Sequence, residues 1–319
     1  MKRILVTGAA GTVGLQVLRF LLSEGKYEVT ALELKNKHVY KRLKHMRKRI
    51  NIVYGDINDD FLVDALIKEH DVVIHCAGVL PPFANVRDDL CKVVDYKGTV
   101  NIVNAIKNYN PSCMLLYASS TSVYGNQEKY TDLKVSTPCN IDDFDSYSNY
   151  KIKAEDYIKN NLKNYSIFRL AYILGDPKHE SLIYNVAPNM NLETLSSEDA
   201  GYAFVAAIDN MKSVNKKTFN VSGGEKFRVS YKEYLNEIFK SYGLSIRFLS
   251  TWIMAEKNYY CGYYADSNKL EDLLHFRSKN LSVYYNTTLE KYRHSIFRFL
   301  PRLFAIPFCL SFKKENKDK

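Results

Sequence analysis

A tyrosine and a lysine stand four residues apart, at Tyr147 and Lys151. A phenol normally loses its proton near pH 10, so it works as an acid or base at neutral pH only when a cation stabilises the phenolate. Four residues span about one helical turn, which would bring the two side chains to one face. The pair therefore predicts a site where Tyr147 transfers a proton with the help of Lys151.

Three glycines, each three residues from the next, follow an apolar run at the start of the chain: Gly8, Gly11 and Gly14. In dinucleotide sites the first such glycine permits a tight turn, the second lets the backbone approach a pyrophosphate, and the third lets the helix pack on the strand. The amides of Thr12 and Val13, at the start of the expected helix, would then face the phosphates. The spacing predicts a dinucleotide site upstream of the proton-transfer site.

The elements that must position these residues follow from the pattern of apolar residues. In the first half, short apolar runs alternate with helical patterns, which is typical of a parallel sheet with crossover helices. We expect strands at residues 3–7, 28–32, 50–54, 72–75, 114–118, 166–170 and 218–221, and later helices at 197–210 and 230–242. The predicted fold is α/β, a doubly wound parallel sheet of the Rossmann type.

No internal repeat or low-complexity linker divides the chain. We expect a dinucleotide-binding region at residues 1–175, a smaller substrate-covering region at 176–294 packed on it, and an apolar, basic tail at 295–319. Charged residues and prolines interrupt the tail, which makes it a poor transmembrane span. Docking of the tail on the protein is the favoured interpretation, and peripheral contact with a membrane is the alternative.

The composition bounds the class of protein. With 319 residues, 46% of them hydrophobic, the chain can bury a sizeable core, so we expect a soluble globular protein. The first residues contain no apolar stretch long enough for a signal peptide, which favours a cytoplasmic location. The six cysteines have no metal-binding spacing, so we expect reduced thiols and no metal.

The net charge of +10 is unevenly distributed, because the stretch between Glu33 and Asp56 is basic and contains no acidic residue. Its basic residues are Lys35, Lys37, Lys41, Arg42, Lys44, Arg47, Lys48 and Arg49. A solvated helix face is the favoured interpretation. The alternatives are a grip on a cofactor 2′-phosphate or attraction to anionic lipid. We expect no nucleic-acid partner, because only one aromatic residue is interleaved and no binding module surrounds the stretch.

Glu33 ends the second expected strand, nineteen residues after Gly14. A carboxylate at this point can accept hydrogen bonds from both ribose hydroxyls and repels a 2′-phosphate. The position therefore favours NAD over NADP. Lys35 and the basic stretch after it keep NADP open as the cofactor.

Further motifs follow in order: a Gly-Asp-Ile turn at residues 55–57, His-Cys-Ala-Gly at 75–78, and Asp-x-x-Gly-Thr-x-Asn at 95–101. With the glycine motif they resemble the extended short-chain dehydrogenase/reductase proteins, the group of NAD-dependent epimerases and dehydratases, over residues 1–242. The resemblance implies that Asp56 and Ile57 form the turn that holds the adenine, and that Ala77 and Gly78 run along the cofactor. Asp95 stands where the family pattern has asparagine.

Residues 118–125 resemble the Ser-Ser-x-x-Val-Tyr-Gly strand end of this family. Aligned on Val-Tyr-Gly, Ser120 falls on the position of the catalytic hydroxyl. The resemblance implies that Ser120 hydrogen-bonds a substrate oxygen while Tyr147 gives or takes its proton. It also implies that Lys151 binds ribose hydroxyls and lowers the tyrosine pKa as hydride moves to or from the nicotinamide.

The same segment narrows the reaction. Dehydratases of the family carry Thr-Asp-Glu before Val-Tyr-Gly, and related decarboxylases carry a glutamate at the place of Ser122. This chain has Ser-Thr-Ser at 120–122, so no carboxyl group stands there to drive either reaction. Oxidation, reduction or epimerisation through a keto intermediate is what we expect.

The substrate is less determined. Tyr172 replaces an asparagine that often contacts a nucleotide sugar in the family, and the link at 176–196 contains no arginine, so Arg228 or Arg247 would have to hold a diphosphate. The aromatic stretch 252–264 would line a pocket or close the core.

The leading interpretation is an oxidoreductase or epimerase for a small-molecule substrate, a sugar or nucleotide sugar. The alternatives are a reductase for a hydroxysteroid-type or other lipophilic ketone, and a non-catalytic NAD(P) sensor. The resemblance also suggests a homodimer, formed through the helices near Asn101 and Lys151.

Overall fold

The structure is a computed structural model that describes residues 1–81, 83–125, 132–140, 145–174, 187, 190–241 and 262–292. Arg247, most of the aromatic stretch at 252–264 and the tail at 295–319 lie outside these residues.

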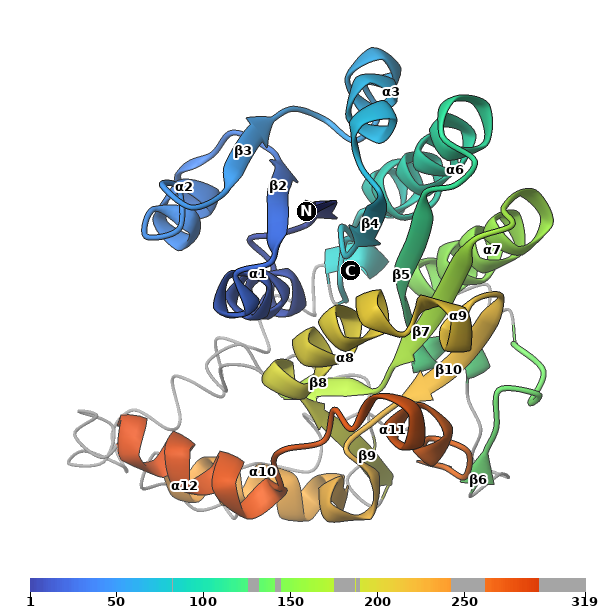
Figure 1. The fold of residues 1–319 in the computed structure, drawn as a ribbon. Coiled ribbons are helices and arrows are strands. Elements are labelled where there is room, and N and C mark those ends of the chain that lie inside the picture. Colours follow the sequence, from blue (N-terminus) through green and yellow to red (C-terminus); the bar gives the residue numbers. More distant parts are fainter. Residues whose placement is uncertain are drawn as a thin grey trace.

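A sheet of seven parallel strands forms the centre of the protein, in the order β10-β7-β5-β4-β1-β2-β3 (Figure 1). Its strands are β1 (Lys2–Thr7), β2 (Tyr27–Glu33), β3 (Asn51–Tyr54), β4 (Val72–His75), β5 (Met114–Ser120), β7 (Tyr165–Leu170) and β10 (Lys217–Val221). All seven expected strands are confirmed, and so is the doubly wound fold. The order reverses between β1 and β4, where open α/β sheets place their ligands at the carboxyl ends of the strands.

Helices cover both faces of this sheet (Figure 1). They are α1 (Thr12–Glu24), α2 (Lys37–Leu43), α3 (Asp60–Glu69), α6 (Gly98–Tyr109), α7 (Ser146–Asn161) and α8 (Ser197–Asp209). Side chains of a strand point alternately to opposite faces, so neighbours on β1 enter different cores. Ile4 packs in the core that includes α1 and α8, whereas Leu5 packs in the core of α3, α6 and α7. The two hydrophobic layers hold the sheet between them.

Between β4 and α6 the chain forms three short helical turns that the apolar pattern does not reveal. These are α4 (Phe83–Val86), α5 (Asp88–Cys91) and a π-helical turn, η1 (Lys92–Lys97), which runs directly into α6. π-Helical turns inside helices are rare and often lie at functional sites. This segment packs against α7 and brings Asp95 into the interior.

The second half of the chain adds a smaller region, at the lower end of the view in Figure 1. It contains a three-stranded sheet, β11 (Arg228–Ser230), β9 (Asn191–Ser196) and β8 (Tyr172–Leu174), and a two-stranded sheet, β12 (Tyr263–Tyr264) and β6 (Asp132–Leu133). Its helices are α9 (Met211–Val214), α10 (Tyr231–Ser241), α11 (Asn268–Leu274) and α12 (Leu281–Tyr292). The division at residue 175 stays a prediction, but β10 from the second half joins the larger sheet.

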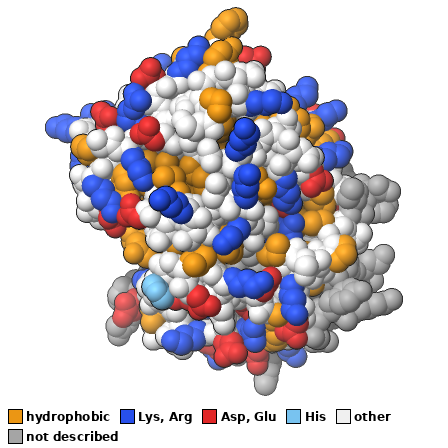
Figure 2. Space-filling view, turned by 45° about the vertical axis from the view of Figure 1, so that its right-hand side comes forward, with side chains coloured by type: hydrophobic (Ala, Val, Ile, Leu, Met, Phe, Trp, Pro, Cys, Tyr) orange, Lys and Arg blue, Asp and Glu red, His pale blue; other side chains and the backbone are white. Residues whose placement is uncertain are grey.

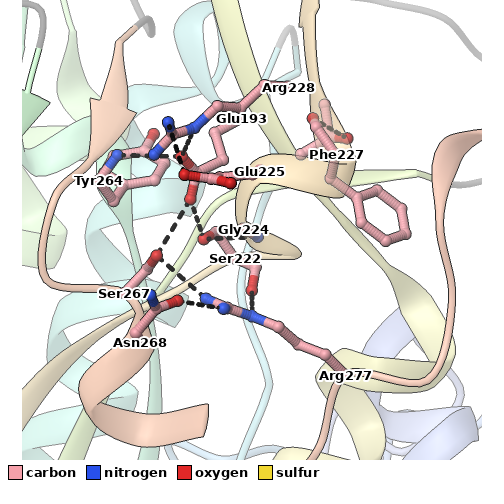
Figure 3. Close-up of polar contacts among 11 residues, drawn as sticks. Glu193, Ser222, Gly224, Glu225, Phe227, Arg228, Tyr264, Ser267, Asn268 and Arg277 are labelled. Atoms are coloured by element: carbon pink, nitrogen blue, oxygen red, sulfur yellow. Dashed lines mark hydrogen bonds and ion pairs between the residues drawn. The ribbon is translucent and has the colours of Figure 1, made fainter.

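A buried carboxylate organises this smaller region (Figure 3). Glu193 on β9 accepts hydrogen bonds from Arg228 Nε at 2.8 Å and from Ser267 Oγ at 3.1 Å, and it also bonds the hydroxyl of Ser222. Arg277 donates to the Ser222 carbonyl at 2.8 Å and to Ser267 at 3.0 Å. The network therefore joins β9, β11, the end of β10 and α11 into one unit.

Basic side chains on the face drawn in Figure 2 lie among acidic and neutral ones, with hydrophobic areas between them. Within the part of the chain that the structure describes, no helix is long and apolar enough to cross a membrane.

Candidate active site

The carboxyl ends of four neighbouring strands bring the expected site residues together. In the register of the sheet, Thr7 at the end of β1 lies beside Leu32 on β2 and His75 on β4, and His75 lies beside Tyr117 on β5. Gly8, Glu33, Ala77 and Ser120 come at or just after these strand ends, so they gather at one edge of the sheet.

Tyr147 and Lys151 lie on α7, as the spacing predicts. Asp145 caps the helix by accepting a hydrogen bond from the Ser148 amide at 3.1 Å. Both functional side chains are buried, with exposed fractions of 7% for Tyr147 and 3% for Lys151. Lys151 Nζ lies 5.6 Å from the centre of the Tyr147 ring and 5.0 Å from the centre of the Tyr117 ring. The ammonium is therefore held close to two phenols.

The Lys151 ammonium also has two oxygen partners. It lies 3.1 Å from Asp95 Oδ1 and donates to the Ala118 carbonyl at 3.1 Å. The Asp95 contact was not expected from the sequence, where the only signal was an aspartate in place of the family's asparagine. Tyr117 was likewise missed, because it looks like an ordinary apolar strand residue.

Ser120 ends β5, and its hydroxyl accepts a hydrogen bond from the Ser122 amide at 3.1 Å. It lies close enough to Tyr147 for hydrogen bonding to lower the pKa of the phenol. Ser119 points the opposite way and donates to Glu155 at 2.6 Å. Ser119 is thus engaged with Glu155, and the hydroxyl that lies beside the Tyr147 phenol is that of Ser120.

Burial is the largest influence on Tyr147 and raises its pKa above the ordinary value for a phenol. Lys151 acts in the expected direction and lowers the pKa, while Asp95 raises it. Burial also opposes the charge on Lys151, yet Tyr117, Asp95 and Tyr147 hold its pKa well above the ordinary value. In this structure Tyr147 is therefore a neutral phenol beside a charged ammonium.

The glycine turn has the geometry of a phosphate cradle. Gly8 has a φ of 64°, and a Cβ there would lie 2.5 Å from the Ala77 amide nitrogen. A Cβ on Gly14 would lie 2.2 Å from the Gly8 carbonyl oxygen. α1 starts at Thr12 with no side-chain cap at Gly11 and no acidic residue in its first turn. The first amides, those of Thr12 and Val13 among them, are thus available to an anion at the positive end of the helix.

Glu33 lies directly beside this turn. Its Oε1 accepts a hydrogen bond from the Ala10 amide at 2.5 Å, and burial raises its pKa. The basic stretch reaches the same place, because Arg42 on α2 contacts the Gly11 carbonyl at 3.4 Å and lowers the pKa of Glu33. A carboxylate and a guanidinium therefore border the region where a dinucleotide would place its adenosine ribose.

The remaining expected cofactor residues lie in the segments that follow β3 and β4. Asp56 is exposed at the end of β3, and Ile57 is buried against Gly98 at the start of α6. Ala77 adjoins the glycine turn, while Gly78 adjoins the lysine, since a Cβ on Gly78 would lie 3.4 Å from Lys151 Nζ. The segment after β4 thus connects the glycine turn to the proton-transfer residues.

Arg228 and Tyr172, which the sequence raises in connection with the substrate, both contact other protein side chains in the structure. Arg228 is already engaged, because its Nε bonds Glu193 and its guanidinium lies 4.4 Å from the centre of the Tyr263 ring. Tyr172 packs edge-on against Tyr234 with the ring centres 6.2 Å apart. Among the described residues no cluster of histidine, cysteine or acidic side chains is arranged to hold a metal ion.

Comparison with known proteins gives the following similarities. The chain is 30% identical to CDP-paratose 2-epimerase of Salmonella typhi over 134 residues, which cover 40% of the chain and 39% of that enzyme. It is 26% identical to a decarboxylating sterol-4-alpha-carboxylate 3-dehydrogenase of Schizosaccharomyces pombe over 249 residues, covering 70% and 71%. The fold matches the crystal structure of UDP-glucuronic acid 4-epimerase from Bacillus cereus, with a TM-score of 0.74 at 20% identity, covering 91% and 99%.

The family model of the NAD dependent epimerase/dehydratase family matches residues 4–199, which include the glycine turn, Glu33, Ser120 and α7. This agreement in both sequence and fold confirms the family resemblance, the enzymatic class and NAD as the family's cofactor. The chain belongs to the NAD dependent epimerase/dehydratase family.

Proposed function

We propose that this protein catalyses NAD-dependent hydride transfer at a secondary alcohol or ketone, with Ser120, Tyr147 and Lys151 as the catalytic residues. The observation that carries the proposal is the position of Lys151. Its ammonium is buried beside Tyr147 and next to Gly78, at the strand ends that also carry the glycine turn. A buried ion pair such as that of Lys151 with Asp95 adds little net stability, because both charges lose their hydration, so stability alone does not explain a lysine at this place.

Each residue has a distinct task. Tyr147 would exchange a proton with the substrate oxygen, and Ser120 would donate a hydrogen bond to that oxygen. Lys151 would stabilise the phenolate when it forms and hold the ribose. Bound NAD supplies the hydride chemistry. The glycine turn, the Thr12 and Val13 amides, Glu33, Asp56, Ile57, Ala77 and Gly78 would hold the cofactor.

We further propose a sugar or nucleotide sugar as the substrate, which makes the enzyme an epimerase or oxidoreductase. Support comes from the similarity to CDP-paratose 2-epimerase and UDP-glucuronic acid 4-epimerase. Dehydration and decarboxylation are not proposed, because Ser120, Thr121 and Ser122 provide no carboxyl group beside Tyr147. Dimerisation through α6 and α7 stays a prediction.

A lipophilic substrate is the second candidate, and one feature of the structure favours it. Leu80, Phe83 and Val86 are apolar and exposed, at 62%, 53% and 49%, on the segment that follows Gly78. Ala84 in the same segment packs in a small cluster with Tyr147. An apolar ligand at this site would cover these side chains. The match to a sterol dehydrogenase over 70% of the chain supports the same candidate.

The experiment combines cofactor binding with turnover. Calorimetric titration with NAD, NADH, NADP and NADPH comes first, followed by assays with CDP- and UDP-sugars and with hydroxysteroids. We expect tight NAD(H) binding, and we expect Tyr147→Phe to abolish turnover while cofactor binding persists. Tyr150→Phe is the matched control, because Tyr150 lies on the same helix with its hydroxyl on Asp88 at 3.3 Å.

Three results would argue against the proposal. Unchanged turnover in Tyr147→Phe would refute the assigned mechanism. Cofactor binding without turnover on either panel would favour the NAD(P)-sensing alternative. Failure to bind any of the four cofactors would exclude both.

A further inference from the structure

Asp95 is a fully buried acidic residue whose carboxylate is directed at the Lys151 ammonium. Its exposed fraction is 0%, and Oδ1 lies 3.1 Å from Lys151 Nζ. Oδ1 makes no hydrogen bond to any of the described residues apart from this ion pair. A buried charge without a partner is costly, and the Lys151 ammonium is the group that compensates this oxygen.

The rest of the Asp95 side chain is fixed by its surroundings. Oδ2 accepts hydrogen bonds from the Val79 amide at 2.9 Å and from Cys91 Sγ at 3.4 Å. Asp95 lies on the π-helical turn η1. The backbone carbonyl of Asp95 accepts a hydrogen bond from Thr99 Oγ1 at 2.7 Å. A Cβ on Gly78 would lie 2.6 Å from Oδ1, so the glycine leaves the space that the ion pair occupies.

The groups that face this pair come from every element packed around it. They are Cys91 from α5, Tyr117 and Ser120 from β5, Tyr147 from α7 and His75 from β4. Burial raises the pKa of Tyr117 to about 12 and lowers that of His75 to about 3, so both are neutral at pH 7. Asp95 is therefore the acidic residue in contact with Lys151. A second acidic residue, Glu155, lies one turn further along α7.

We propose that Asp95 is a positioning residue for the proposed catalytic pair: its carboxylate holds the Lys151 ammonium in place and offsets the charge of that ammonium beside Tyr147. The inference rests on the proposed function and deepens it. Burial raises the pKa of Tyr147 most, Lys151 lowers it, and Asp95 acts against Lys151 and raises it. Asp95 thereby adds to burial in keeping Tyr147 protonated, and it moves the use of Tyr147 as a base to higher pH.

The test is a pH titration of Tyr147 itself. Protein labelled with ¹³C at the tyrosine ring carbon that carries the hydroxyl is titrated by NMR, and Tyr147→Phe assigns the signal among the 25 tyrosines. In Asp95→Asn and Asp95→Ser the Tyr147 phenol should lose its proton at a pH at least about one unit lower than in the wild type. Cys91→Ser is the control, because Cys91 contacts the other oxygen of the Asp95 carboxylate, Oδ2, and its replacement leaves the charge of Asp95 in place, so the wild-type titration should be retained.

Titration of Tyr147 in both neutral Asp95 variants at no lower pH than in the wild type would overturn the inference. Thermal unfolding and NAD binding of each variant establish that a folded protein is being titrated. Two substitutions of Asp95 are made so that the test can still be read if one of the variants does not fold. The titration uses no substrate, so its result is independent of whether Tyr147→Phe abolishes turnover. In an alcohol-oxidation assay, the acid limb of kcat/KM should also move to lower pH in Asp95→Asn.

Discussion

Glu155 on α7 accepts two hydrogen bonds from the guanidinium of Arg169 on β7, at 2.9 and 2.7 Å. Glu155 lies one turn beyond Lys151 on the same helix, and both partners of the pair are buried. Ser119 at the end of β5 donates to the same carboxylate. Glu155 thus joins the helix that carries Tyr147 and Lys151 to β7 through a buried ion pair and to β5 through a hydrogen bond.

Removing one partner of this pair should be strongly destabilising. Glu155→Gln leaves the Arg169 guanidinium buried without a counter-charge, so the free energy of unfolding should fall by roughly 3–5 kcal/mol. Glu69→Gln is the matched control, because the Arg3–Glu69 pair is equally close at 2.7 Å but exposed. Its loss should stay below about 1 kcal/mol. Urea unfolding measures both, and equal losses would contradict the role assigned to Glu155.

Two glycines with the same backbone conformation should respond differently to alanine. Gly8 has a φ of 64° and Gly25 a φ of 65°, but a Cβ on Gly25 would have nothing within 4 Å. Gly25→Ala should therefore cost only the strain of the left-handed conformation, about 1–2 kcal/mol. Gly8→Ala adds a clash with the Ala77 backbone, so it should cost more and abolish NAD binding. Thermal unfolding measures the loss of stability in both variants, and calorimetry measures their NAD binding. An NAD affinity unchanged by Gly8→Ala would mean that the glycine turn does not hold the cofactor phosphates.

His75 should make the protein sensitive to acid. It is fully buried between Thr7 Oγ1 and Thr99 Oγ1, at 2.7 and 3.0 Å, and burial lowers its pKa to about 3. The unfolded chain takes up the proton near pH 6.5, so the contribution of His75 is fully present above that pH. As pH falls from 6.5 towards 3, the free energy of unfolding should drop by about 1.4 kcal/mol per pH unit on account of this residue.

The measurement is the unfolding free energy of the wild type and of His75→Gln as a function of pH. Glutamine has no proton to gain in this range, so the variant should show a smaller slope between pH 6.5 and 4. Parallel curves for the two proteins would mean that His75 is not the group responsible.

Glu33 should set the cofactor preference. Glu33→Gln removes the charge that repels a 2′-phosphate and weakens the bonds to the ribose, so NAD affinity should fall about tenfold or more while NADP affinity rises. Glu28→Gln on the same strand is the control, since Glu28 is exposed near the other end of β2. Calorimetric titration with both cofactors gives the ratio. A constant ratio of the two affinities would assign the preference to other residues, with Arg42 the first to examine.

The sequence was most informative where local rules decide the structure. The strands of the large sheet and the helical spacing of Tyr147 and Lys151 follow from apolar periodicity, and Gly8 follows from a turn that requires a positive φ. The three-residue strands β8 and β11 were missed, because they are too short to show a period. The contacts of Lys151 with Asp95, and of Arg169 with Glu155, were also missed. They join residues distant in the chain and depend on packing that no local pattern encodes.

β10 gives the larger sheet its last strand, and this has a consequence for how the chain must be made. Residues 217–221 pair with β7, whose six residues are all buried. During synthesis, α7, which carries Tyr147 and Lys151, is complete before residues 217–221 are made. Until those residues leave the ribosome, one edge of β7 has no partner strand. A chain that ends near residue 175 would keep that apolar edge open to other chains, and such edges promote aggregation. Residues 1–175 therefore lack the last strand of the seven-stranded sheet, which residues 217–221 supply.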